Sequence, residues 1–292
     1  MRKWFCSFFI YCIAVFSFPL SALEIGGIII DDSDQRAQVS FSRGAWSTSE
    51  AGRTVKIPLL TVKFSSGNYN YSVRHDGAGP FKNNIGISYP STYNWYQSGG
   101  FSLLINEKKY ATGIDSDEKF YVAEEGQRAD AVFNWNNEIA QVSYNFCSFY
   151  HDRNLYLIIK INPHQEIKSL SFKMDAFPGG FLKNHQQHPL ILYDNSGEQV
   201  IANRTKLKLD ADKTDFVFFG RDKSLLKEGF KGGCGVVFAD RNLQAIEISH
   251  FFSSTLILHF APETKVIRLA FSEILKASAY EDFQKQYPQA LE

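Results

Sequence analysis

The sequence predicts an all-β fold, a large antiparallel β-sandwich with a C-terminal helix. Short segments rich in β-branched and aromatic residues recur along the 292 residues, and many alternate apolar with polar side chains. A period of two buries one face of a strand and leaves the other in water. Clusters of Asn, Asp and Gly separate the segments. Such short turns join antiparallel strands, because a parallel return needs a crossover of about a dozen residues or more.

The first residues are typical of a secretory signal peptide. Arg2 and Lys3 form a positive region, residues 4–18 form an uncharged apolar run, and Pro19 ends that run. Ala22 offers a small residue for cleavage. The run is shorter than the roughly 20 residues of a membrane-spanning helix, although an uncleaved anchor is the alternative. We therefore expect a signal peptide over residues 1–22, a secreted or periplasmic protein, and no stable membrane span after cleavage.

Residues 23–292 would then form the mature chain. Its 270 residues suit a single β-sandwich domain. The mature chain holds 29 basic and 31 acidic residues, which gives a formal charge of −2. A near-neutral chain without a basic cluster lacks the electrostatic surface that nucleic acid requires. We expect no nucleic-acid partner.

Apolar segments bounded by turn residues predict the individual strands. These segments cover residues 54–64, 101–105, 131–135, 139–150, 154–161, 167–174, 215–220, 234–240, 243–252, 254–260 and 265–271. Asn136 and Asn137 separate two of them, and this pair predicts a tight hairpin.

Two segments have a helical pattern. Residues 222–228 predict one or two helical turns. An apolar stripe predicts a terminal helix over residues 272–287, which Ser272 would cap and Pro288 would end. The stripe consists of Ile274, Leu275, Ala279 and Phe283.

Only Cys147 and Cys234 remain once the signal peptide is removed. In an oxidising compartment they could form a disulfide. Alternatively, both are buried thiols that behave as small apolar side chains. The sequence leaves both alternatives open, because it does not measure the distance between the two Cα atoms.

The segment from Asp175 to Pro189 holds His185 and His188, which would lie on one face of a short helix and could share a metal. A third ligand at characteristic spacing is missing. Pro178 and the glycines after it instead favour a rigid chain reversal. We therefore predict no metal and no cofactor. The common hydrolase, protease and nucleotide-binding motifs are also absent from the sequence.

A polar segment over residues 66–100 is rich in Gly, Asn and Ser and carries several aromatic residues. Loops of this composition run over the surface, so Tyr93, Trp95 and Tyr96 are predicted to be partly exposed. Exposed rings beside polar donors such as Arg74 suit a sugar, because the ring packs on C–H groups while the donors bind hydroxyls.

The predicted architecture resembles the carbohydrate-handling domains of the mutarotase-like super-sandwich type, which is a fold-level analogy only. We interpret the chain as an exported glycan-associated binding module of the cell envelope or exterior, with a polysaccharide or oligosaccharide as partner. One alternative is a carbohydrate-active enzyme in which His75, Asp76, His185 and His188 meet in a cleft. Another is a structural envelope protein with an unpaired edge strand or a large apolar patch.

Overall fold

The computed structural model describes most of the chain from Arg36 onward, within one compact unit, Arg36–Glu292. The described ranges are 36–50, 53–67, 69–76, 84–89, 100–110, 112–114, 119–176, 189–220, 233–238, 242–251, 253–274 and 279–285. The predicted signal peptide and the predicted helix over residues 222–228 lie outside these ranges.

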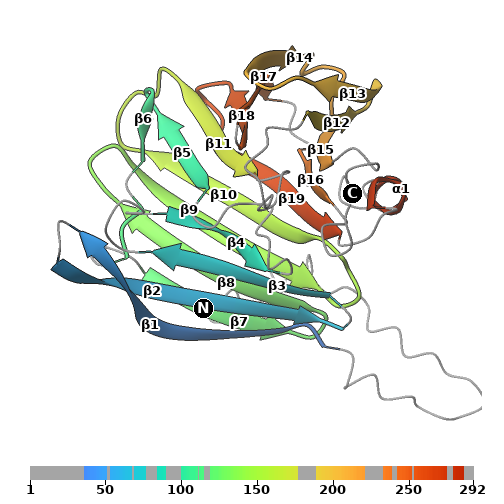
Figure 1. Ribbon diagram of the computed structural model, residues 1–292. Coiled ribbons are helices and arrows are strands. Elements are labelled where there is room, and N and C mark those ends of the chain that lie inside the picture. Colours follow the sequence, from blue (N-terminus) through green and yellow to red (C-terminus); the bar gives the residue numbers. More distant parts are fainter. Residues whose placement is uncertain are drawn as a thin grey trace, which may run out of the picture. The chain divides into compact units, whose positions relative to one another are not determined.

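The predicted fold class is confirmed, because the described residues form almost only antiparallel strands in two large sheets (Figure 1). The first sheet has 10 strands in the order β1-β2-β3-β4-β5-β11-β18-β17-β14, with β6 paired to β5. Its strands are β1 (Gln38–Glu50), β2 (Arg53–Ser66), β3 (Tyr69–Asp76), β4 (Asn84–Tyr89), β5 (Phe101–Ile105), β6 (Lys108–Lys109), β11 (Leu170–Ala176), β14 (Thr205–Leu209), β17 (Leu243–His250) and β18 (Ser254–Phe260).

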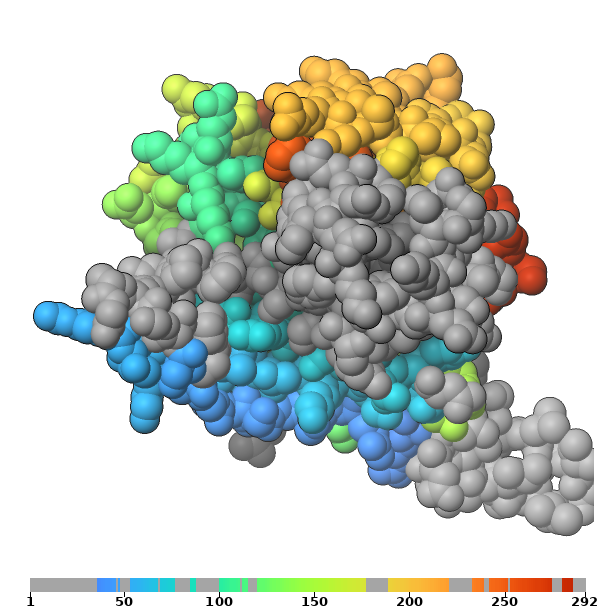
Figure 2. Space-filling view, viewed as in Figure 1, coloured from blue at the N-terminus to red at the C-terminus, as the bar shows by residue number. Residues whose placement is uncertain are grey.

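The second sheet has nine strands in the order β13-β12-β15-β16-β19-β10-β9-β8-β7. Its strands are β7 (Lys119–Glu125), β8 (Arg128–Asn136), β9 (Ala140–Phe149), β10 (Leu155–Pro163), β12 (Leu190–Asp194), β13 (Gly197–Ile201), β15 (Phe216–Gly220), β16 (Gly233–Val237) and β19 (Val266–Ile274). The two sheets thus end in the edge strands β1, β14, β13 and β7. In Figure 2 the blue atoms of β1 and β2 lie along the lower margin of the view.

Alternate residues of both sheets meet in one buried apolar cluster. In β10, Leu155, Leu157 and Ile159 are fully buried, whereas the residues between them are half-buried or exposed. Phe101 of the first sheet stacks on Phe271 of the second, with ring centroids 4.9 Å apart. The alternation of apolar and polar residues along the strands therefore has the cause that the sequence predicts: two pleated sheets pack face to face and bury every second side chain.

The predicted hairpin at Asn136 and Asn137 joins β8 to β9. The side-chain Oδ1 of Asn137 accepts hydrogen bonds from the backbone N–H groups of Ile139 and Ala140, at 2.9 and 3.2 Å. An asparagine side chain that accepts hydrogen bonds from the backbone N–H groups two and three residues ahead stabilises a turn by itself. The sequence thus predicted this reversal for the right reason.

The terminal helix α1 (Ala279–Gln284) is shorter than predicted and begins later. Ser272 and Ile274 do not start a helix but complete β19, where they pair with Gly235 and Gly233 of β16. The end of β19 is buried on both faces, so it shows no alternation that would identify a strand. In the described part of the chain, no helix is long and apolar enough to cross a membrane.

Helix α1 covers the outer face of the second sheet over β12, β15, β16 and β19. Phe283 is fully buried there, and Tyr280 stacks on Tyr193 with ring centroids 3.7 Å apart. The outer face of β7, β8 and β9 lies beyond this apolar cluster, and Tyr156 on β10 packs against its margin. One half of the sheet's outer face is therefore apolar and covered by the helix, and the other half carries polar side chains.

Candidate functional site

Most of the residues that the sequence analysis selects for ligand binding or catalysis lie outside the described residues. This applies to Tyr93, Trp95 and Tyr96 of the predicted sugar platform and to His185 and His188 of the predicted cleft. Their roles stay predictions.

The remaining selected residues are consecutive on β3 and point to opposite faces of the first sheet. His75 is fully buried between the sheets, with Nε2 2.7 Å from the carbonyl oxygen of Thr112 and edge-on ring contacts to Phe133 and Trp135. On the outer face, the Nε of Arg74 donates to Asp76 over 2.9 Å. Neighbouring residues of a strand face opposite ways, so His75 and Asp76 do not share a cleft.

Three of the four other described histidines have separate polar partners, and the fourth, His151, lies against the ring of Tyr150. His164 lies 2.8 Å from Asn136, and His250 lies 2.9 Å from Ser254. His259 Nδ1 lies 3.0 Å from the hydroxyl of Ser171. Among the residues that the structure describes, no group of three or more His, Cys, Asp and Glu side chains could hold a metal ion.

Cys147 and Cys234 are free thiols, so the buried-thiol alternative is the correct one. Both lie in the second sheet, but β10 and β19 separate their strands, which places the Cα atoms roughly 14 Å apart at about 4.8 Å per strand. Cys234 faces the first sheet, whereas Cys147 lies opposite Asp130 on the outer face. A disulfide needs Cα atoms within about 7 Å.

We expect both thiols to resist alkylation in the folded protein. Burial raises the pKa of Cys147 to about 12 and raises the pKa of Cys234 well above its ordinary value, so little reactive thiolate exists. Peptide mass spectrometry after iodoacetamide treatment at mildly alkaline pH should find both unmodified, and both modified after unfolding. Ser42→Cys, at an exposed position on β1, is the reactive control. Rapid native labelling of Cys147 would contradict the assigned burial.

The other half of the outer face, which we call the β7–β10 face, presents three aligned rows of side chains, in which Val132 and Cys147 are buried. The strand registers place Tyr121, Val132 and Asn145 side by side in one row. The next row holds Asp130, Cys147 and Tyr156, and the row beyond it pairs Arg128 with Phe149. Cross-strand neighbours on one face lie about 5 Å apart, so these side chains form a continuous surface.

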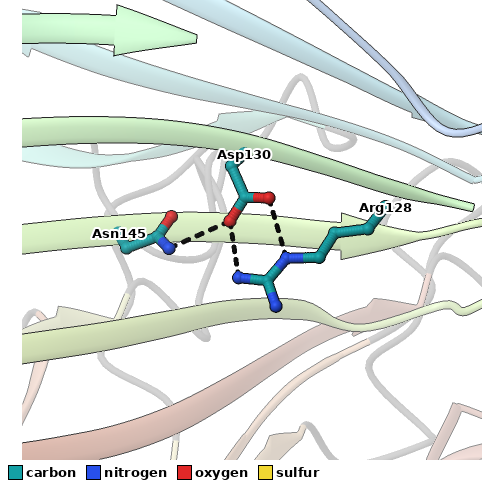
Figure 3. Close-up of polar contacts among 3 residues, drawn as sticks. All are labelled: Arg128, Asp130 and Asn145. Atoms are coloured by element: carbon teal, nitrogen blue, oxygen red, sulfur yellow. Dashed lines mark hydrogen bonds and ion pairs between the residues drawn. The ribbon is translucent and has the colours of Figure 1, made fainter. Parts of the chain in front are cut away.

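A polar cluster lies on the β7–β10 face (Figure 3). Arg128 donates two hydrogen bonds of 2.7 Å to the carboxylate of Asp130, and Asn145 Nδ2 donates a third of 2.9 Å. The hydrogen bond to Asp130 raises the pKa of Arg128, so the guanidinium stays charged. Among the described residues, the buried Oδ1 of Asn145 has no hydrogen-bond partner.

Aromatic side chains surround this cluster. Tyr121 on β7 is 55% exposed. Phe149 lies below the Arg128 guanidinium, 5.6 Å from its carbon to the ring centroid, and contacts Tyr156 edge-on at 5.4 Å. Burial raises the pKa of Tyr156, whose hydroxyl donates to Asp152, so the phenol stays neutral. The face therefore combines one open ring with a rigid, charged hydrogen-bonding cluster.

This arrangement is suited to binding rather than to proton transfer. The carboxylate of Asp130 is engaged by Arg128 and Asn145, and the hydroxyl of Tyr156 is engaged by Asp152, so neither is poised as an acid or a base. A carboxylate, a guanidinium and an amide that are joined by hydrogen bonds can also bind hydroxyl groups.

Sequence reasoning missed the Arg128, Asp130 and Asn145 cluster. Arg128 and Asp130 lie on β8, and Asn145 lies on β9. Only the register of these two strands, in which Val132 pairs with Asn145, brings the three side chains together. A usable signal was nevertheless present, because Arg128 and Asp130 occupy alternate positions of a strand whose other positions are apolar.

Comparisons with known proteins find structural likeness but no family. No protein-family model matches the sequence, and no curated protein sequence matches it. Among solved structures, an alpha-N-acetylgalactosaminidase from Bifidobacterium bifidum in complex with GalNAc is 10% identical with a TM-score of 0.48. That alignment covers 84% of this chain and 38% of the enzyme.

Two further solved structures have a similar level of likeness. A TPR-domain containing protein from Parabacteroides distasonis is 7% identical with a TM-score of 0.45, over 81% of this chain and 54% of the other. A GH36 alpha-galactosidase from Geobacillus stearothermophilus is 8% identical with a TM-score of 0.41, over 80% and 40%. This chain thus aligns with 38% to 54% of the length of these proteins. Likeness at this level does not establish an activity.

Proposed function

We propose that this protein is an exported glycan-binding module of the cell envelope or exterior. The observation that carries the proposal is the β7–β10 face, where the exposed ring of Tyr121 lies beside the fixed polar cluster of Arg128, Asp130 and Asn145. A sugar ring presents C–H groups on one side and hydroxyls around its edge. An aromatic ring therefore suits its face, and the planar polar groups suit its edge.

The size of the face supports an oligosaccharide rather than a single sugar. Tyr121 and Asn145 lie two strands apart, about 10 Å. Arg268 on β19 lies in the same row, two strands beyond Asn145. The row from Tyr121 to Arg268 is therefore about 19 Å long. Because this surface belongs to a sheet, a glycan would bind with little rearrangement of the backbone.

The predicted platform of Tyr93, Trp95 and Tyr96 with Arg74 remains a second location for the glycan. Arg74 lies on the outer face of the first sheet, so it belongs to a surface different from the β7–β10 face. The enzyme alternative has less support, because His75 is enclosed in the core and is separated by the sheet from Asp76.

Titration with soluble polysaccharides and oligosaccharides, followed by calorimetry, tests the function. If one of them binds, Tyr121→Ala should weaken binding roughly threefold to tenfold, as expected for an aromatic contact of about 0.5–1.5 kcal/mol. Asp130→Asn should also weaken binding, because it removes the ion pair that orients Arg128. Val200→Ala is the matched control, since Val200 is 65% exposed on the same sheet but outside the face.

Trp95→Ala separates the two locations. Loss of binding in Trp95→Ala with normal binding in Tyr121→Ala would move the site to the predicted platform and leave the function intact. A folded protein that binds no glycan from a broad panel would contradict the proposed function.

A further inference from the structure

Most backbone groups along the outer edge of β1 have no partner in the part of the chain that the structure describes. Val39 turns its N–H away from β2, since it donates to the carboxylate of Glu124 over 2.7 Å, and the N–H of Ala37 donates to the carbonyl of Gly126. Backbone groups of alternate residues point the same way along a strand. The N–H and C=O groups of every second residue after Val39 therefore also point away from β2. These residues are Phe41, Arg43, Ala45, Ser47 and Ser49.

Within the described residues, none of these five has a hydrogen-bond partner for those groups. The backbone of the first part of β1 is engaged by Glu124 and Gly126, whereas further along only side chains reach β7, where Phe41 and Arg43 contact the ring of Phe120. From Phe41 to Ser49 the open edge extends about 27 Å. Residues 40–45 are all exposed as well.

The edge of β1 has few of the features that usually protect an edge strand. It holds no proline and no lysine, its register with β2 is unbroken from Gln38 to Glu50, and its charged residues are Arg43 and Glu50. Edge strands are ordinarily short, charged, bulged or interrupted by proline. The edge strand β14, by comparison, has five residues and carries Lys206 and Lys208. An edge as long and regular as that of β1 is suited to pairing with another strand.

Nothing among the described residues accounts for the glycine at position 44 in the middle of β1. A Cβ atom built on it would meet nothing within 4 Å, and its φ is not in the left-handed region. A glycine inside a strand weakens that strand, and it often marks a place where another backbone approaches closely. Gly44 is also the central residue of Gln38–Glu50.

We propose that β1 pairs with β1 of a second copy of this chain, antiparallel and with the two-fold axis at Gly44. This register joins Arg43 to Ala45 and Phe41 to Ser47 of the other copy, twice each. All four residues turn their backbone groups outward, so the pairing would form about eight hydrogen bonds. The two copies would then share one continuous sheet.

The charges of β1 are compatible with this register. Its two formal charges belong to Arg43 and Glu50. In the symmetric pairing Arg43 faces Ala45 and Glu50 faces Gln38, so no like charges lie directly opposite, and the two Arg43 side chains are diagonal neighbours that can turn away from each other. The exposed ring of Phe41, 51% accessible in one copy, would be partly covered. An isologous contact of this kind closes on itself as a dimer and does not grow into a fibre.

A charge exchange at Gly44 tests both the association and its register. Because the two Gly44 residues face each other, Gly44→Lys and Gly44→Glu each place two like charges at the axis. Each variant alone should associate at least tenfold more weakly than the native chain in sedimentation equilibrium. An equimolar mixture of the two variants should recover association, since Lys then faces Glu. Lys265→Glu, an exposed change remote from β1, is the control and should associate like the native chain.

A native chain that stays monomeric at all concentrations would overturn the proposal. The same holds if Gly44→Lys and Gly44→Glu each associate as tightly as the native chain, or if their mixture recovers nothing. Circular dichroism and thermal unfolding of the dilute variants show whether each is folded. Misfolding is not expected, because the space around Gly44 is open.

Discussion

Replacing Phe133 by alanine is expected to lower the free energy of unfolding by about 3–5 kcal/mol. Phe133 is fully buried and has ring contacts with four neighbours that span both sheets. These neighbours are His75, Phe120, Trp135 and Phe146. Removing the ring leaves a cavity between the layers, because stiff aromatic neighbours collapse poorly into the space. Urea unfolding followed by tryptophan fluorescence measures the effect.

Tyr121→Ala provides the control for this prediction. Tyr121 lies on the adjacent strand and on the outer face, with its ring 55% exposed, so its loss should change the free energy of unfolding by roughly 0.5 kcal/mol or less. Equal effects of the two substitutions would contradict the assignment of inner and outer faces. The same measurement shows whether the glycan-binding variant is folded.

Gly235→Ala is expected to cost about 1–3 kcal/mol by overpacking the contact between β16 and α1. A Cβ atom on Gly235 would lie 2.3 Å from Cε2 of Phe283, and that ring is fully buried. The helix has to move away from the sheet, or its ring has to leave its pocket. Thermal unfolding and the protease sensitivity of the C-terminal segment should both respond.

A double-mutant cycle identifies the cause. In a Phe283→Ala background the space beside Gly235 is empty, so Gly235→Ala should cost much less there than in the native chain. The expected coupling is of the order of 1 kcal/mol or more. Additive effects would mean that Gly235 is needed for a reason other than the position of α1.

The position of α1 also bears on the proposed function. The helix covers the apolar half of the outer face of the second sheet, where Ile191, Phe216 and Phe218 are buried. The polar half remains uncovered by it, and this half carries Arg128 and Asp130. Sheets of a sandwich expose one face each, so an uncovered face with a built polar cluster is a natural place for binding.

The hairpin of β12 and β13 shows where local reasoning fails. Its two strands meet at the turn over Asp194–Gly197, and neither strand is among the segments that the sequence predicts. All residues of β12 are buried, so the strand has no polar alternation. The burial of both faces depends on α1 and on neighbouring strands that lie far away along the chain.

What the sequence by itself determined is the layered antiparallel architecture and most of its strands. Alternation such as that of Leu155, Leu157 and Ile159 is a local property, since it requires only one buried face and one wet face. Turn chemistry is local as well, as Asn137 shows by closing its own hairpin.

Only the tertiary structure decided which side chains meet. His75 and Asp76 are neighbours in sequence but are separated by a sheet, whereas Arg128, Asp130 and Asn145 are joined across two strands. The physical reason is strand register, which is set by the packing of the whole sandwich and which no short segment encodes. The same holds for β1, because the unpaired state of an edge depends on what the rest of the chain leaves beside it.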